Sequence, residues 1–204
     1  GSLGDDSLIG GAGDDLLDGG EGFDSVDFSA VLEQLMVDLP RGIATGDGTD
    51  QLRNIERVIG GKSHDVLIGD HAKNILLGGV GNDRLSGGAG DDLLDGGIGT
   101  DTVDYTGVTA GLALAVVVDL SRGIATGDGL DQLIAIEQVI GSGLNDTLIG
   151  DDGKNTLEGG AGNDLIQGGG GQDRLDGGSG SDQLEGGAGD DWLIGGAGDD
   201  RLDG

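Results

Sequence analysis

Residues 159–203 read GGAGNDLIQ, GGGGQDRLD, GGSGSDQLE, GGAGDDWLI and GGAGDDRLD, five consecutive segments of nine residues that share one pattern. In each nonamer the first, second and fourth residues are Gly and the sixth is Asp. The eighth residue is always Leu or Ile. A fixed period of this kind predicts a repeat architecture, in which each unit buries its apolar residue only by stacking on its neighbours.

The same nonamer fills two further blocks of the chain. There are three units in the first block, five in the second and seven in the third, which makes 15. Position 1 is Gly and position 8 is Leu, Ile or Val in all 15, and position 6 is Asp in 13 and Asn in two. We therefore divide the chain into repeat block, spacer, repeat block, spacer and repeat block, with the bounds 1–27, 28–59, 60–104, 105–140 and 141–204.

Each conserved column of the nonamer has a physical role. Gly at positions 1, 2 and 4 permits a backbone with positive φ and the close approach of a neighbouring turn or a ligand. Asp at position 6 brings a hard oxygen ligand into that turn. Positions 7 to 9 are expected to form a short strand whose middle residue points inward, so that stacked units bury a ladder of aliphatic side chains.

Composition excludes several classes of protein. The 204 residues include 49 Gly, 39 acidic residues and only 10 Lys or Arg, and the formal net charge is -29. Cys is absent, which excludes disulfides and thiolate metal sites. Such an acidic chain should repel nucleic acids and anionic lipids, and it has no apolar run of membrane-spanning length. We expect no nucleic-acid partner and no direct membrane insertion.

The repeats closely resemble the haemolysin-type calcium-binding repeat of the RTX family, whose nonamer is GGxGxDxUx. Units such as GGAGDDLLD at 10–18 and 87–95 and GGAGNDLIQ at 159–167 match every defined position. The resemblance implies an all-β fold, a right-handed parallel β-roll (a β-solenoid) with 18 residues per turn. It also implies calcium in the Gly/Asp turns, between nonamer n and nonamer n+2, bound by position-6 carboxylates and by carbonyls around positions 2 to 4.

Calcium suits this ligand set because it takes six to eight oxygens, carbonyls included, whereas magnesium demands a tighter octahedron. The residues that the resemblance assigns to metal binding are Asp6, Gly11, Gly13, Asp15, Gly20, Gly22, Asp24, Asp65, Gly79, Gly81, Asp83, Gly88, Gly90, Asp92, Gly97, Gly99, Asp101, Asp146, Gly160, Gly162, Asp164, Gly169, Gly171, Asp173, Gly178, Gly180, Asp182, Gly187, Gly189, Asp191, Gly196, Gly198 and Asp200.

The rule of n and n+2 predicts about nine calcium ions. Nine position-6 pairs lie within the blocks, namely 6/24, 65/83, 74/92, 83/101, 146/164, 155/173, 164/182, 173/191 and 182/200. Nine ions would carry +18 and reduce the net charge of -29 to -11. The two units that open the second block and the two that open the third depart from the nonamer, so their sites are expected to be the weakest.

The two spacers resemble each other. Residues 37–60 and 118–141 are identical at 19 of 24 positions, at an offset of 81 residues, or nine nonamers. The preserved phase predicts that the spacers continue the solenoid, with longer strands such as Leu112–Leu120; an independent helical insert is the alternative. Asp47 and Asp128 are further candidate calcium ligands.

Other residues favour simpler interpretations. The only imidazoles, His64 and His71, lack the partners of a zinc site and are expected to be exposed turn residues. Trp192 at position 7 should point outward, and Asp at positions 5 and 9 should be solvated. No Ser/His/Asp or Cys/His constellation is present, and paired carboxylates are too frequent to identify an acid–base pair. We therefore expect no enzymatic activity.

The resemblance implies calcium-triggered folding of a bacterial protein after type I secretion, so that the secretion machinery is a partner in transit and the location is extracellular. The module would stabilise the protein that carries it. Because repeat arrays need capping units and the last nonamer runs to residue 203, we expect a monomeric module of a longer chain. The alternatives are an adhesin or matrix-attachment spacer and an accessory module of an extracellular enzyme.

Overall fold

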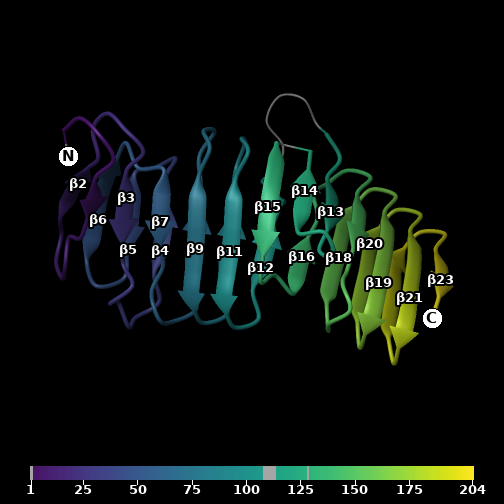
Figure 1. The fold of residues 1–204 in the computed structure, drawn as a ribbon. Coiled ribbons are helices and arrows are strands. Elements are labelled where there is room, and N and C mark those ends of the chain that lie inside the picture. The colour runs from purple at the N-terminus through teal and green to yellow at the C-terminus, as the bar shows by residue number, and fades with distance from the viewer. Residues whose placement is uncertain (1, 108–113, 128) are drawn as a thin grey trace. The chain divides into compact units, whose positions relative to one another are not determined.

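The computed structural model describes residues 2–107, 114–127 and 129–204. In these residues the regular structure is entirely β, and Figure 1 shows neighbouring strands such as β9 and β11 lying side by side in the same direction. No helix in the described part of the chain is long and apolar enough to cross a membrane. The chain divides into two compact units, Gly1–Asp101 and Thr102–Gly204, which we describe separately.

The first unit contains two sheets, ordered β1-β3-β7-β9-β11 and β2-β6-β5-β4-β8-β10 among the described residues. Its strands are β1 (Ser7–Leu8), β2 (Leu16–Asp18), β3 (Ser25–Asp27), β4 (Met36–Asp38), β5 (Ile43–Thr45), β6 (Thr49–Arg53), β7 (Arg57–Ile59), β8 (Val66–Ile68), β9 (Ile75–Val80), β10 (Arg84–Ser86) and β11 (Leu93–Ile98).

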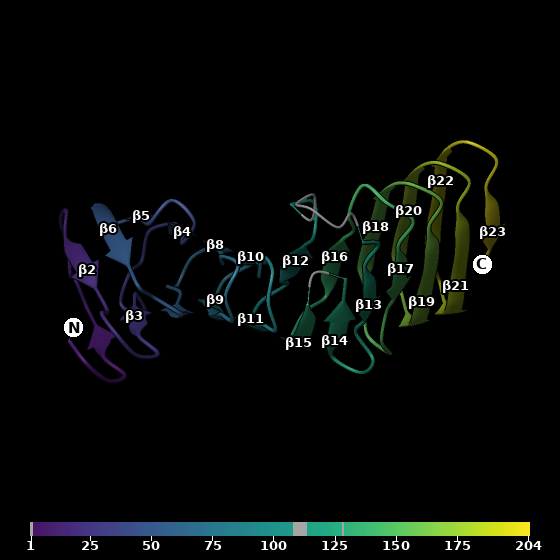
Figure 2. The same cartoon turned by 90° about the horizontal axis from the view of Figure 1, so that it is seen from above.

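The second unit repeats this plan with sheets ordered β15-β14-β13-β17-β19-β21-β23 and β12-β16-β18-β20-β22. Figure 2 separates β17, β19 and β21 from β18, β20 and β22 as two layers. Its strands are β12 (Thr102–Asp104), β13 (Val117–Asp119), β14 (Ile124–Thr126), β15 (Leu130–Ile134), β16 (Gln138–Ile140), β17 (Thr147–Ile149), β18 (Thr156–Ala161), β19 (Leu165–Gly171), β20 (Arg174–Ser179), β21 (Gln183–Gly189), β22 (Trp192–Ala197) and β23 (Arg201–Asp203).

Strand pairing within the repeats confirms the parallel β-roll. Leu94 of β11 pairs with Leu76 of β9, and Leu175 of β20 pairs with Leu157 of β18. Both pairs are parallel and join residues 18 positions apart. Two nonamers therefore make one turn of the coil, and successive nonamers alternate between the two sheets.

Position 8 forms the core, as the sequence predicts. Leu67, Leu76, Leu85 and Leu94 are consecutive position-8 residues of the second block, and each has an exposed fraction of 0%. Full burial of a Leu side chain contributes about 1.5–3 kcal/mol. Since each repeat adds one such residue, the aliphatic ladder is continuous only when neighbouring turns are stacked.

The spacers add strands to the sheets, but with an antiparallel strand that we did not expect. In the first spacer β5 pairs antiparallel with both β4 and β6, while β4 is parallel to β8 and β6 is parallel to β2. The chain reverses after β4 because the Gly42 amide donates to the Leu39 carbonyl, at 3.0 Å, and Gly42 has a φ of 65°.

The second spacer forms the same three-stranded meander through β13, β14 and β15. The long strand expected at Leu112–Leu120 lies partly outside the described residues, and the strand there is β13. Asp128 also lies outside the described residues.

Candidate metal centre

The Gly-rich half of each nonamer forms a turn from one sheet to the other. Position 2 adopts positive φ in most units, as at Gly79, where φ is 102°. A Cβ atom built on Gly81, at position 4, would overlap the carbonyl oxygen of Ser63 in the neighbouring turn. Gly is therefore required because successive turns are in main-chain contact, and the carbonyl oxygens of one turn face the next.

A ladder of hydrogen bonds joins the position-6 side chains. The backbone N–H of residue 6 in one turn donates to the side-chain Oδ1 of residue 6 in the turn two nonamers later, at 2.7–3.0 Å. All nine pairs predicted from the sequence make this bond, namely 6/24, 65/83, 74/92, 83/101, 146/164, 155/173, 164/182, 173/191 and 182/200. The predicted pairing of turns is thus present as hydrogen bonds from the backbone of one turn to the side chain of the next.

The second carboxylate oxygen has a different environment. Within the described residues it is buried and has no hydrogen-bond partner in Asp15, Asp24, Asp83, Asp164, Asp173, Asp182 and Asp191. Burial, together with the neighbouring position-6 carboxylates of Asp65 and Asp101, raises the pKa of Asp83 to about 6. Burial likewise raises the pKa of Asp164 to about 6. A buried carboxylate with an unpartnered oxygen is costly unless a cation compensates it.

Five turns at the beginnings of the blocks are closed by their own backbone. In these closed turns the N–H of position 2 donates to the position-6 side chain of the same nonamer, as from Gly61 to Asp65 Oδ2 at 2.6 Å and from Ser142 to Asp146 Oδ2 at 2.6 Å. The other three closed turns contain Asp6, Asn74 and Asn155.

Position 2 decides whether a turn is open or closed. Open turns, in which the second carboxylate oxygen is buried and unpartnered, have a position-2 Gly with positive φ, and closed turns do not. Gly61 is a glycine without positive φ, and its turn is closed. The block entries are therefore the weaker candidate sites for a physical reason, because the oxygen that an ion would bind already accepts an N–H group.

The donor set fits a hard cation that binds both carboxylates and carbonyls. In the described residues no group of three or more acidic or His side chains converges as a metal cluster. An ion between two turns would instead take position-6 carboxylates together with main-chain oxygens. The carbonyls of Gly79 and Gly162 face the following turn, since a Cβ on Gly97 or Gly180 would overlap the carbonyl of the turn before it. Calcium accepts such a mixture.

Two further acidic residues occupy position-6 places that the sequence analysis missed. The Asp15 amide donates to Asp50 Oδ1 at 2.9 Å, and the Asp24 amide donates to Glu56 Oε2 at 2.8 Å. Asp50 belongs to TGDGTDQLR, residues 45–53, which keeps Gly at positions 2 and 4, Asp at 6 and Leu at 8. This nonamer could have revealed Asp50 from the sequence, but it was overlooked because its position 1 is Thr and not Gly.

Position 5 also has a role that we had not expected. Its side chain accepts the N–H of position 5 in the turn two nonamers later, as from Asn163 to Asn145 Oδ1 at 2.8 Å. His64 does the same, accepting the Asn82 N–H at Nδ1, at 2.6 Å. Position 5 thus helps to hold neighbouring turns together, and His64 is an exposed turn residue as predicted.

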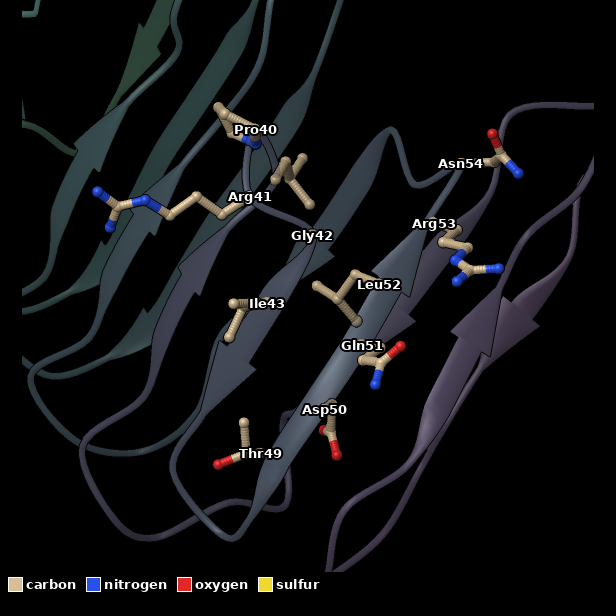
Figure 3. Close-up of a pocket in the computed structure, with 11 residues that line it drawn as sticks. Pro40, Arg41, Gly42, Ile43, Thr49, Asp50, Gln51, Leu52, Arg53 and Asn54 are labelled. Carbon is tan, nitrogen blue, oxygen red and sulfur yellow. The ribbon is translucent and has the colours of Figure 1, made fainter.

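Other surface features lie apart from the repeat turns. Trp192 is 66% exposed, as expected for position 7, and its ring lies 5.1 Å from the Arg174 guanidinium. A groove over the first spacer is lined by residues 39–43 and 49–54 (Figure 3). Arg41 in this groove pairs with Asp38 at 3.3 Å.

Comparison with known proteins gives a clear family assignment. No curated protein matches the chain. Among solved structures, it is similar to the extracellular lipase LipA from Serratia marcescens, with 20% identity and a TM-score of 0.33 over 72% of this chain. The chain spans 31% of the length of that lipase. The sequence model of the RTX calcium-binding nonapeptide repeat matches five stretches that together exceed half of the chain, residues 1–26, 54–83, 72–103, 140–175 and 176–204. The chain therefore belongs to the family of RTX calcium-binding nonapeptide repeat proteins.

Proposed function

We propose that this chain is a non-catalytic module that folds on binding calcium, and that it belongs to a secreted bacterial protein. The observation that carries the proposal is the set of buried, unpartnered Oδ2 atoms on successive position-6 carboxylates, represented by Asp164, Asp173 and Asp182. A carboxylate in this state destabilises the folded chain by several kcal/mol, roughly, if no cation accompanies it.

Calcium bound between the turns would supply the missing positive charge and would be coordinated by the unpartnered carboxylate oxygens. The chain itself contributes the framework: the hydrogen-bond ladder aligns the carboxylates, and the Gly positions let carbonyl oxygens approach. Since the stacked turns are also what buries the position-8 side chains, ion binding and burial of the core are coupled. Binding free energy then becomes folding free energy.

This coupling supports a role in secretion. Extracellular calcium modules bind with dissociation constants of roughly 10⁻⁴–10⁻³ M, far above the calcium concentrations of cell interiors. The chain would remain unfolded inside the cell, pass through type I secretion machinery, and fold outside as a monomeric module. The folded β-roll would then stabilise the protein that carries it. About nine ions are expected, and the closed turns would bind last.

A calcium titration of the EDTA-stripped chain, followed by far-UV circular dichroism, tests the proposal. We expect a cooperative transition from coil to β-structure with calcium, and none with the same concentrations of magnesium. A chain that is fully β-structured in EDTA and does not respond to calcium would contradict the folding role. Equilibrium dialysis in the same buffers gives the number of ions bound per chain.

A further inference from the structure

The hairpin turn of the first spacer packs against the turn at residues 10–15 as if it were the next repeat. We propose that these two turns hold an additional calcium ion, bound between Asp15 and Asp50, of which Asp50 lies outside the stretches that match the repeat family. The inference rests on the proposed function, because it assumes that the repeat turns bind calcium.

The first support is the position-6 ladder. The Asp15 amide donates to Asp50 Oδ1 at 2.9 Å, although 35 residues separate the two. Within the second block the Asp83 amide donates to Asp101 Oδ1 at 2.7 Å, across the normal 18 residues. Asp50 therefore lies where the next repeat would place its position-6 carboxylate. The strands β4 and β5 only lengthen the chain segment between the two residues.

The main chain of the two turns is also joined as in a repeat pair. The Gly13 amide donates to the Asp47 carbonyl at 3.2 Å, which is the bond from position 4 to position 3 that Gly81 makes with Ile98 at 2.9 Å. A Cβ on Gly48 would overlap the Gly13 carbonyl oxygen, as a Cβ at position 4 does elsewhere in the repeats. The Gly13 carbonyl thus faces the hairpin.

Position 5 completes the correspondence. The Thr49 amide donates to Asp14 Oδ1 at 2.8 Å, as the Thr100 amide donates to Asn82 Oδ1 at 3.1 Å. Positions 3 to 6 of a repeat turn are therefore reproduced by residues 47–50. Figure 3 shows Thr49 and Asp50 at the hairpin end of β6.

An independent observation indicates a ligand at this junction. Asp15 Oδ2 is buried and has no hydrogen-bond partner in the described residues, the same condition found in the open turns of the repeat blocks. Asp50 is only 2% exposed, so a second carboxylate is buried beside it. Two acidic side chains in such a position, with the carbonyl of Gly13 directed at the same junction, require a cation to compensate their charge.

The second spacer contains a hydrogen bond from a tyrosine hydroxyl that the first spacer lacks. There the carboxylate equivalent to Asp50 is Asp131, and its Oδ2 accepts a hydrogen bond from the Tyr105 hydroxyl at 3.0 Å. Phe28 occupies the place of Tyr105, because each is the first residue of its spacer. The Phe28 amide donates to the Ile59 carbonyl, and the Tyr105 amide donates to the equivalent carbonyl of Ile140. Phe28 has no hydroxyl, so it cannot donate the equivalent hydrogen bond to Asp50.

The positions 1 and 2 of a repeat turn are not reproduced, because β5 takes their place. The Gly96 carbonyl is among the atoms nearest to a Cβ built on Gly78, whereas the three atoms nearest to a Cβ built on Gly10 all belong to Asp15. Fewer carbonyls therefore face this ion than face an ion between two full repeats. We expect this site to fill at higher calcium concentrations than the sites of the third block.

The test counts ions bound to the full chain by equilibrium dialysis against calcium chloride and atomic absorption. Asp50→Asn keeps a carbonyl oxygen for the Asp15 amide but removes the charge. Phe28→Tyr gives the first spacer a hydroxyl like that of Tyr105, which donates to Asp131 in the second spacer. Asp190→Asn, at an exposed position 5, is the control for loss of one charge. Both spacer variants should bind one ion fewer than the wild-type chain, and Asp190→Asn the same number.

The outcomes separate this inference from the proposed function. If the wild-type chain binds no calcium, the proposed function fails. If it binds calcium and folded Asp50→Asn binds as many ions as the wild type, only the site at the hairpin is refuted. Far-UV circular dichroism in saturating calcium establishes that each variant is folded. Should Asp50→Asn not fold, the ion count of Phe28→Tyr decides, and an unchanged count overturns the proposal.

Discussion

Replacing Asp182 by Asn should remove two calcium sites, whereas replacing Asp200 by Asn should remove one. Asp182 Oδ1 accepts the Asp164 amide at 2.8 Å, and the Asp182 amide donates to Asp200 Oδ1 at 3.0 Å. Asp182 therefore belongs to two junctions between turns, and Asp200 to one among the described residues. Asn retains an oxygen acceptor for the ladder and loses only the charge.

The size of the effect follows from mass action. An ion that binds the folded chain and not the unfolded chain adds about 1.4 kcal/mol to the free energy of unfolding for each tenfold rise in free calcium above the dissociation constant. The slope of the free energy of unfolding against log calcium should fall by about 2.8 kcal/mol per decade in Asp182→Asn. In Asp200→Asn it should fall by about 1.4 kcal/mol per decade.

Guanidinium unfolding, followed by far-UV circular dichroism at several free calcium concentrations, measures these slopes. Asp190→Asn carries the same change of charge at an exposed position and should keep the wild-type slope. Equal losses of slope in Asp182→Asn and Asp200→Asn would refute the sharing of one carboxylate between two junctions. Slopes that match the wild type in both variants would refute the assignment of position 6 as a calcium ligand.

Three further predictions concern the calcium-free chain, the core and the turns. Because burial raises the pKa of Asp164 to about 6, the folded calcium-free chain binds more protons than the unfolded chain between about pH 4 and 6. Its stability should therefore rise as the pH falls through this window, seen as a gain of β-signal in EDTA; a loss of signal would contradict the burial of these carboxylates. Leu175→Ala, at a fully buried position, should cost about 2–5 kcal/mol in calcium, whereas Leu202→Ala, at a 46% exposed position, should cost far less; similar midpoints of guanidinium unfolding would disprove the ladder core. Gly177→Ala should weaken calcium binding because its Cβ overlaps Asp182 Oδ2, while Gly170→Ala, whose Cβ makes only ordinary contacts, is the control in a dialysis measurement.

The repeating part of the fold could be predicted from the sequence because one period controls both packing and ligands. Position 8 alternates between the sheets and is buried at Leu76 and Leu85, as a nonamer with one inward residue requires. The pairing of position-6 residues such as Asp83 and Asp101 was implied by the resemblance to the RTX repeat, in which two nonamers make one turn. The inward place of position 8 depends on spacing alone, so no knowledge of the backbone conformation was needed for it.

Features that depend on single backbone dihedrals escaped prediction. Gly61 occupies position 2 like other glycines, yet its turn is closed, since its φ is not positive. The antiparallel β5 could not be read from the spacer, because a hairpin turn and a repeat turn use the same Gly and Asp residues. Asp50 was missed for that reason, although its place in TGDGTDQLR was visible.

The closed turns also bear on how the calcium response begins. Each block opens with one or two turns whose position-6 side chain is satisfied by an N–H of its own nonamer, beginning with Asp6, Asp65 and Asp146. Such turns need no ion of their own to meet their hydrogen-bonding requirement, so once calcium is present they can form the first ordered part of each block. The open turns that follow then elongate an existing template, one ion and one turn at a time, as stacked repeats permit. Ordering should thus spread from the entry of each block, and no block has to be ordered all at once.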